Sequence, residues 1–311
     1  DLLFSYSNIC AIFNKLFPYL DKIKYIISNL SNLDITTELK FFSLSQFAQI
    51  CLKNKLYEES YDYLNYINYI SGPNVCFNDM SFFGNTDKNK TLLLYEGGGL
   101  GDNIMFSRFL PILSNKYKNN KINFVINNRL LWLFEIIFSN LSNVLFFPYN
   151  KLDIIHDINK FNYHCNTISL IKNLKYTYNT IPFTPLFKSI TLNLTENTEN
   201  IINEIKLYNN TYIINWKGNS LCTHEKYNRG MNLNNAIPLF KLNHINWIVI
   251  TKDVTKEEKI LLDRHGVKYY GEQIDNLNAF YDSISIIRNV NGIFSTDTSL
   301  LHLSANLDVP T

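Results

Sequence analysis

Four glycines occupy five consecutive positions between an apolar run and a helix-like pattern. The stretch EGGGLGD spans residues 96–102, and Gly97, Gly98, Gly99 and Gly101 are four of only eleven glycines in the chain. Glycines between a strand and a helix allow another group to come close to the backbone. Asp102 at the start of the helix would place a carboxylate at the carboxyl edge of the sheet, where α/β folds bind their ligands. Alternatively it is an N-cap, which contributes about 1 kcal/mol.

This glycine loop does not match the common nucleotide-binding motifs. A dinucleotide fingerprint requires G-x-G-x-x-G and an acidic residue about 20 positions later. Gly97 and Gly99 fit, but Asp102 takes the place of the third glycine, and residues 122–129 (INFVINNR) contain no acid. A P-loop requires Gly-Lys-Ser/Thr, which the loop lacks. A nicotinamide dehydrogenase is therefore the least favoured class of enzyme.

A second polar cluster lies near the end of the chain. Residues 295–299 (STDTS) follow the apolar pair Ile293-Phe294 and precede a helix-like pattern that carries His302. A single helix cap needs only one such side chain, whereas free N–H groups and partial positive charge at a helix start suit a phosphate. We predict phosphate binding here. The alternative is a capping box with His302 packed on the helix.

Two further clusters are less specific. The strand-like stretch 211–216 runs into Lys217, Gly218 and Asn219, and a polar loop with Arg229 follows. A solvated loop and a buried Trp216 are the simpler interpretation of this stretch. Residues 161–170 (FNYHCNTISL) contain one adjacent His-Cys pair, His164 and Cys165, which lacks the spacing of a metal site.

Composition limits the class of protein. The 311 residues are 46% hydrophobic and 18% charged with a net charge of +2, which is typical of a soluble globular chain. No Lys/Arg block indicates nucleic-acid binding, and no apolar run reaches the roughly 20 residues of a membrane helix. Five cysteines without a CxxC motif indicate free thiols in a reducing compartment. We expect a cytoplasmic protein without a metal or cofactor.

The pattern of apolar runs predicts the fold class. From residue 91 onward short apolar runs alternate with helical patterns, which predicts an α/β protein with parallel sheets. The predicted strands are 91–95, 122–126, 143–147, 211–216, 246–251, 267–270 and 291–295. The predicted helices are 103–117, 129–139, 168–174, 197–207, 233–241, 255–264, 278–288 and 298–306.

The N-terminal segment differs from the rest of the chain. Residues 1–72 show helical spacing, with two helices expected on either side of the polar break at residues 53–55 (KNK). The pattern resembles one tetratricopeptide unit, and an ordinary helical hairpin is the alternative. The chain lacks an initial Met and ends in the strand-like LDVPT, so we expect it to be a fragment. The predicted organisation is a helical segment over residues 1–72, a linker 73–90, an α/β domain 91–195 and an incomplete α/β domain 196–311.

Taken in order, four blocks resemble one family. Bacterial-type proteins with tetratricopeptide repeats and a glycosyltransferase domain related to the lipopolysaccharide heptosyltransferases (glycosyltransferase family 9) carry a comparable series. The blocks here are GGGLGDNIMFSRFLPIL at 97–113, FNYHCNTISL at 161–170, WKGN at 216–219 with Arg229 after it, and STDTSLLHLSANLDVP at 295–310.

The resemblance implies a GT-B glycosyltransferase with two Rossmann-like domains. The first would hold the acceptor and the second a nucleotide-sugar, in an inverting transfer without a metal. The matching aspartate of the family, here Asp102, is implied as the general base. Acceptor-side residues would be Gly97, Gly98, Gly99, Gly101 and His164. Donor-binding residues would be Lys217, Asn219, Arg229, Asp297, Thr298, Ser299 and His302.

The chain departs from the family pattern at several positions. Gly97-Gly98 stands where the family has Glu-Gln, Asn162 replaces an Asp, and Gly230 replaces a Ser. Asp102, Asp297 and Thr298 are all kept, so an enzyme remains the leading hypothesis. The implied partners are a nucleotide-sugar, a glycan, lipid-linked or protein acceptor, and a protein partner of the helical segment. The alternative is a non-catalytic scaffold built on a degenerate glycosyltransferase fold.

Overall fold

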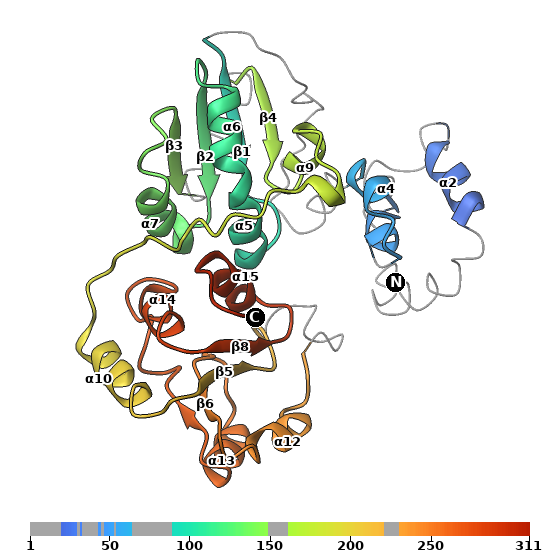
Figure 1. Cartoon of the computed structure of the whole chain (residues 1–311). Coiled ribbons are helices and arrows are strands. Elements are labelled where there is room, and N and C mark those ends of the chain that lie inside the picture. The colour runs from blue at the N-terminus through green and yellow to red at the C-terminus, as the bar shows by residue number, and fades with distance from the viewer. Residues whose placement is uncertain are drawn as a thin grey trace. The chain divides into compact units, whose positions relative to one another are not determined.

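The computed structural model describes residues 20–29, 32, 43–44, 47–52, 54–63, 89–148, 161–220 and 230–311 (Figure 1). Contacts divide the chain into two compact units. Of the described residues, the first unit takes in those up to Gly98 and those within 109–126 and 141–182. The second takes in those within 99–108, 127–140 and 183–311. Each unit contains one parallel four-stranded sheet, which confirms the predicted α/β class.

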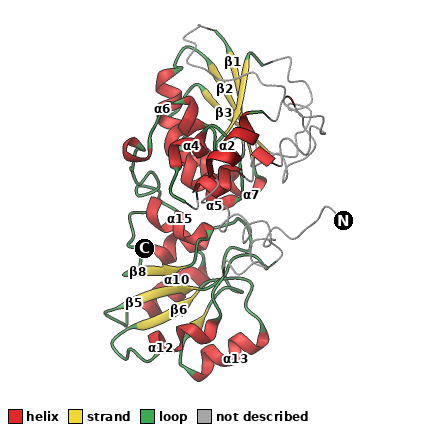
Figure 2. Ribbon diagram, turned by 90° about the vertical axis from the view of Figure 1, so that its right-hand side faces the viewer, coloured by secondary structure: helices red, strands yellow, loops and turns green. Residues whose placement is uncertain are grey.

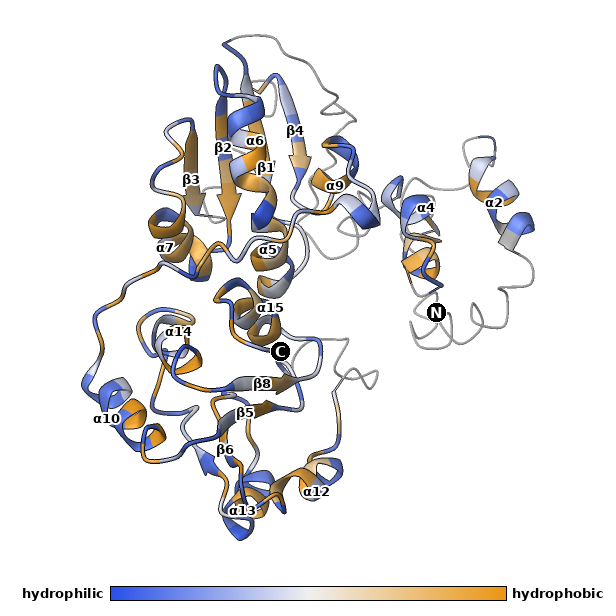
Figure 3. Cartoon of the chain, in the orientation of Figure 1, coloured by the Kyte–Doolittle hydropathy of each residue, from blue (hydrophilic) through white to orange (hydrophobic). Residues whose placement is uncertain are grey.

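The first sheet has the strand order β3-β2-β1-β4, and every pair is parallel. Leu92, Leu93 and Leu94 of its central strand are all buried, as expected for a parallel strand covered on both faces. Figure 3 shows the hydrophobic colour concentrated along β1 and β2. The strands are β1 (Thr91–Tyr95), β2 (Lys121–Ile126), β3 (Val144–Pro148) and β4 (Tyr163–Asn166).

Strand β4 was not predicted from the sequence. Its four residues, YHCN, include two polar side chains and contain no continuous apolar run of the kind that indicated β1 and β2. Pairing with β1 makes it a strand, with Leu93 opposite His164 and Leu94 opposite Cys165. His164, Cys165 and Asn166 are buried there. The predicted short helix that follows is α9 (Leu170–Asn173).

The helix predicted at 103–117 is interrupted. It consists of α5 (Leu100–Phe106), a 3-10 turn η4 (Ser107–Phe109) and α6 (Leu110–Lys116). Pro111 lies in the first turn of α6, where its missing N–H costs no helical hydrogen bond. The prediction of one helix was therefore wrong. The apolar residues keep their helical spacing across the 3-10 turn, so their spacing did not indicate the interruption.

The second sheet has the order β7-β6-β5-β8 and is also parallel throughout. Helices α12 and α13 cover one face, and α14 and α15 cover the other (Figures 1 and 2). The strands are β5 (Thr211–Asn215), β6 (Asn246–Val249), β7 (Lys268–Tyr269) and β8 (Gly292–Ser295). The helices are α10 (Glu196–Ile205), η7 (Leu233–Ala236), α12 (Ile237–Phe240), α13 (Lys256–Arg264), α14 (Tyr281–Ile287) and α15 (Ser299–Asn306).

Two helices that follow strands of the first sheet belong to the second unit by their contacts. These are α5 and α7 (Asn128–Ile137). Trp132 of α7 donates its indole N–H to the carbonyl of Ala279 at 3.2 Å, and its ring lies 5.3 Å from that of Tyr281. Chain order alone would have assigned both helices to the first sheet.

The N-terminal segment is helical at α2 (Leu20–Ser28), at residues 47–52 and at α4 (Tyr57–Tyr61). Helical residues therefore lie on both sides of the polar break, as predicted. In the first unit, the ring of Tyr57 stacks on Tyr178 with centroids 4.3 Å apart. A tetratricopeptide repeat stays a prediction, and residues 73–88 of the predicted linker lie outside the described residues.

The described helices are all too short or too polar to cross a membrane.

Candidate functional site

Each of the four sequence blocks lies at the end of a parallel strand or directly after it. Strand β1 runs into the glycine loop, β4 into Thr167, β5 into Trp216 and β8 into Thr296. In the first sheet β1 and β4 are neighbours, and in the second sheet β5 and β8 are neighbours. At each of these pairs the strand order reverses, and open α/β sheets bind ligands at this switch point. The sequence predicted the loops, and the topology brings them together in pairs.

The switch point of the first sheet is formed by the glycine loop and the end of β4. The N–H of Gly97 donates to the hydroxyl of Thr167 at 2.9 Å, which fastens the two loops together. Gly98 has a φ of 75°, a conformation that glycine adopts without strain. His164 points its buried side chain away from solvent. Its assignment to an acceptor site stays a prediction.

Asp102 lies at the third position of α5 and is not the N-cap. Gly99 is the N-cap, and its N–H donates to Asp102 Oδ2 at 2.7 Å. The carboxylate therefore satisfies one of the backbone donors at the helix start, as the third residue of a capping box does. The role of Asp102 as a general base stays a prediction.

Gly101 allows two helices of the second unit, α5 and α15, to pack closely. A Cβ at this position would lie 2.9 Å from His302 Cδ2, 3.2 Å from Ser299 Cα and 3.3 Å from Ser299 N. The side chain of Asn306 also reaches the carbonyl of Ile104, at 3.5 Å. Figure 1 shows α5 and α15 next to each other. The absence of a side chain at Gly101 therefore lets the backbone of α5 come close to the start of α15.

The switch point of the second sheet is built around Asn215, which the sequence analysis did not single out. Its Nδ2 donates to Ser295 Oγ at 3.0 Å and to Thr298 Oγ1 at 2.8 Å. Its Oδ1 accepts a hydrogen bond from Thr251 Oγ1. The only local signal was an Asn that ends the apolar strand TYIIN. Its partners lie 36 and more residues away along the chain.

The predicted donor-binding residues at the start of α15 lie together. Thr298 is the N-cap by position, but its hydroxyl does not cap the helix. Asp297 Oδ1 lies 3.3 Å from His302 Nε2, and the Asp297 side chain is 75% exposed. A pair in which one partner is so exposed contributes little stability. Ser299 begins the helix beside Gly101.

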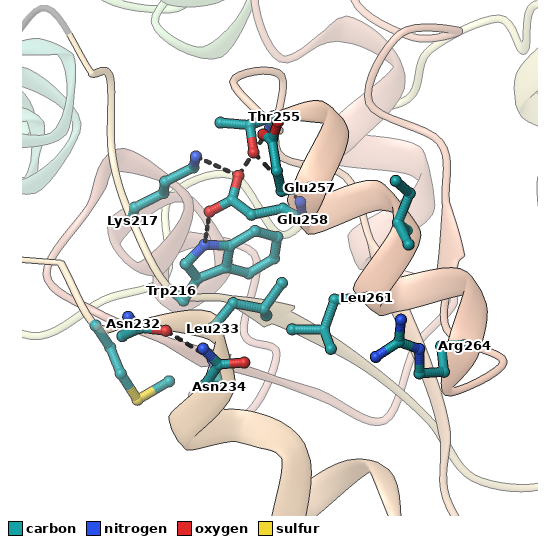
Figure 4. Close-up of a pocket in the computed structure, with 12 residues that line it drawn as sticks. Trp216, Lys217, Asn232, Leu233, Asn234, Thr255, Glu257, Glu258, Leu261 and Arg264 are labelled. Carbon is teal, nitrogen blue, oxygen red and sulfur yellow. Dashed lines mark hydrogen bonds and ion pairs between the residues drawn. The ribbon is translucent and has the colours of Figure 1, made fainter.

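Lys217 is engaged by Glu258 of α13. Its ammonium lies 2.6 Å from Glu258 Oε2, and the same carboxylate accepts from Trp216 Nε1 at 2.8 Å and from the N–H of Thr255 at 2.8 Å (Figure 4). Burial by itself would raise the pKa of Glu258, but these hydrogen bonds outweigh it and hold the pKa below its usual value. Trp216 is 1% exposed, so the expectation that it lies in the core is confirmed.

A pocket of about 380 Å³ adjoins this cluster between η7 and α13 (Figure 4). Its wall combines apolar side chains with both signs of charge. It is lined by Trp216, Lys217, Met231, Asn232, Leu233, Asn234, Thr255, Glu257, Glu258, Ile260, Leu261 and Arg264.

Two predicted donor-side residues, Asn219 and Arg229, follow β5 along the chain. Asn219 is exposed, and Arg229 lies outside the described residues. Among the residues that the structure describes, no three His, Cys, Asp or Glu side chains cluster as metal ligands would.

No family model and no curated protein sequence matches this chain. Among solved structures it is similar to the ADP-heptose lipopolysaccharide heptosyltransferase II of E. coli, with 10% identity and a TM-score of 0.43 over 71% of this chain and 83% of that one.

Two other solved structures are similar to a comparable degree. A family 9 glycosyl transferase from Veillonella parvula DSM 2008 has 11% identity and a TM-score of 0.45, over 74% of this chain and 81% of that one. The iron-containing dodecameric glycosyltransferase TibC from enterotoxigenic E. coli H10407 has 11% identity and a TM-score of 0.47, over 72% of this chain and 57% of that one. A likeness of this degree leaves the function to be argued from the site itself.

Proposed function

We propose that the chain carries a glycosyltransferase of the GT-B type that transfers a sugar from a nucleotide-sugar to an acceptor hydroxyl. The observation that carries this proposal is the pairing of the four sequence blocks at two switch points, one in each sheet. Because a switch point is where an open α/β sheet binds its ligand, two of them suit an enzyme with two substrates. The order of the blocks, which resembles the heptosyltransferase series, gives the substrates their chemical class.

On the donor side, we assign the diphosphate of the nucleotide-sugar to the start of α15. The backbone N–H groups of Thr298 and Ser299 would stabilise the charge of the departing diphosphate. Lys217 and Arg229 would add positive charge. Asn219, Asp297 and His302 would orient the donor. No metal takes part in this proposal.

On the acceptor side, Gly97, Gly98, Gly99 and Gly101 with His164 would form the loop and strand end beside the acceptor. Asp102 would take the proton of the acceptor hydroxyl while the oxygen of that hydroxyl attacks the anomeric carbon of the donor sugar. The bond from that carbon to the diphosphate breaks on the opposite face, so the configuration inverts. The hydrogen bond from Gly99 N–H to Asp102 Oδ2 would hold the carboxylate in place during the step.

Donor binding by the full-length protein is the first test. UDP-, GDP-, ADP- and CMP-sugars would be screened by thermal shift, because a ligand at 100 times its Kd adds about 2.7 kcal/mol of stability. A clear shift with one nucleotide supports the proposal and identifies the base. A cooperatively melting protein that responds to none of them contradicts it.

Turnover then tests the role of Asp102. Asp102→Asn keeps an oxygen that can accept from the N–H of Gly99 but cannot act as a base. We expect transfer to be abolished while the melting temperature and donor affinity stay at the wild-type values. Asp263→Asn, at an exposed position of α13, is the matched control and should leave turnover unchanged. Wild-type turnover in Asp102→Asn would rule out the assignment of the base.

A non-catalytic scaffold is the second candidate, and two contacts favour it. The ammonium of Lys217 is already paired with Glu258 at 2.6 Å. Gly101 lies against Ser299 at the start of α15. The ammonium of Lys217 and the N–H of Ser299, which the enzyme would use for the diphosphate, are thus both in contact with other residues of the protein. A scaffold predicts cooperative unfolding without any response to nucleotide-sugars.

A further inference from the structure

Asn215 is a buried polar side chain that connects three strand ends at the carboxyl edge of the second sheet. It is 2% exposed, and its partners Thr251 and Thr298 are 8% and 7% exposed. The carboxamide donates twice and accepts once, and so joins the ends of β5, β6 and β8. A primary amide offers two donors and an acceptor in one plane, which neither a carboxylate nor a hydroxyl does.

The bond from Asn215 changes how α15 begins. Three helices of the second unit have a threonine at the N-cap position. Thr195 caps α10 and Thr255 caps α13, each accepting from a backbone N–H at 3.2 Å. Thr298 does not cap α15, because its hydroxyl is hydrogen-bonded to Asn215 and lies 3.1 Å from Ser295 Oγ. A side-chain cap contributes about 1 kcal/mol, and this helix forgoes it.

We infer that Asn215 is a positioning residue for the donor diphosphate. It acts through Thr298, whose hydroxyl it holds away from the N–H groups in the first turn of α15. It also fixes residues 295–298 against the ends of β5 and β6. This inference rests on the proposed function, because it assigns those N–H groups to the diphosphate of a nucleotide-sugar.

The test measures the affinity of the full chain for ADP, UDP, GDP and CDP by calorimetry. Asn215→Asp keeps the shape of the side chain, and the three hydroxyls around it can turn to donate to a carboxylate. The variant therefore folds, but it places a negative charge next to the diphosphate. We expect binding to weaken at least about tenfold at pH 8 and to recover toward wild type as the pH is lowered and the carboxyl group is protonated.

Asn215→Ala releases the hydroxyl of Thr298 to cap α15, so the diphosphate must compete with it and affinity falls. Thr251→Val is the matched control. It removes one hydrogen bond from Asn215 but leaves both donations to residues 295–298 intact. We expect the two variants to lower the melting temperature by similar amounts. Only Asn215→Ala should weaken the binding of the nucleotide.

The outcomes separate the two proposals. Should the wild-type chain bind none of the four nucleotides, the proposed function fails and the role of Asn215 fails with it. When the wild type binds but Asn215→Asp and Asn215→Ala bind equally well, the role of Asn215 is refuted and the proposed function stands. A loss in Thr251→Val equal to that in Asn215→Ala would show that Asn215 only stabilises the fold.

Discussion

Gly101→Ala places local helix propensity and tertiary packing in direct opposition. Position 101 lies inside α5, where alanine is favoured over glycine by up to about 1 kcal/mol. The added Cβ, however, would lie 2.9 Å from His302 Cδ2 and 3.2 Å from Ser299 Cα. The imidazole of His302 can move aside, but the backbone at the start of α15 cannot move without shifting the helix.

The size of the effect follows from these two terms. Forcing a methyl group into a packed contact costs about 1–3 kcal/mol, and the propensity gain offsets up to about 1 kcal/mol of this. Because one of the contacts is to backbone, we expect a net loss in the free energy of unfolding of about 1–2 kcal/mol. At about 2–4 °C per kcal/mol for a domain of this size, the melting temperature should fall by about 2–8 °C.

The assay combines thermal melting with hydrogen exchange of residues 296–306. Gly99→Ala is the matched control, because a Cβ there would meet only Asp102 Oδ2 at 3.7 Å. We expect a small loss from the poorer N-cap and no change in the exchange of α15. Gly101→Ala should speed exchange in α15. The packing argument would be refuted by a Gly101→Ala protein that melts at or above the wild-type temperature with α15 equally protected.

Two further predictions follow from the ionisable groups. Glu258→Gln removes the ion pair with Lys217 and should lower the free energy of unfolding at pH 7 by about 1 kcal/mol or less. Because the folded pKa of Glu258 lies below its ordinary value of 4.5, this contribution is complete above that value and is lost as the pH falls through the folded pKa. Denaturation curves of variant and wild type should therefore converge in acid, and a constant difference at every pH would contradict the ion pair. Burial raises the pKa of Cys51 to about 11 and that of Cys165 to about 12. Neither thiol should react with iodoacetamide at pH 8 in the native protein, and rapid labelling of Cys165 mapped by mass spectrometry would contradict its burial.

The sequence predicted the elements whose signal is local. Apolar runs such as Leu92-Leu93-Leu94 indicated seven of the eight strands in the described part of the chain, because a strand buried on both faces is hydrophobic throughout. Small polar residues and glycines after those runs marked the loops that form the candidate site. The four blocks, their order and the position of Asp102 beside the glycine turn were all visible in the chain. Strand β4 was not, since YHCN becomes a strand only by pairing with β1.

Only the tertiary structure decided what each of these residues contacts. Glycine at 101 could have meant a turn, a ligand or a helix contact, and only the structure shows that it lies against α15. Asn215 joins Thr251 to Thr298, and Lys217 pairs with Glu258, across 36 to 83 positions of sequence. Such contacts depend on the order and register of the strands, because these decide which loops lie next to each other at the edge of the sheet. A local pattern fixes where a strand ends, and the order of the strands in the sheet fixes what that end can bind.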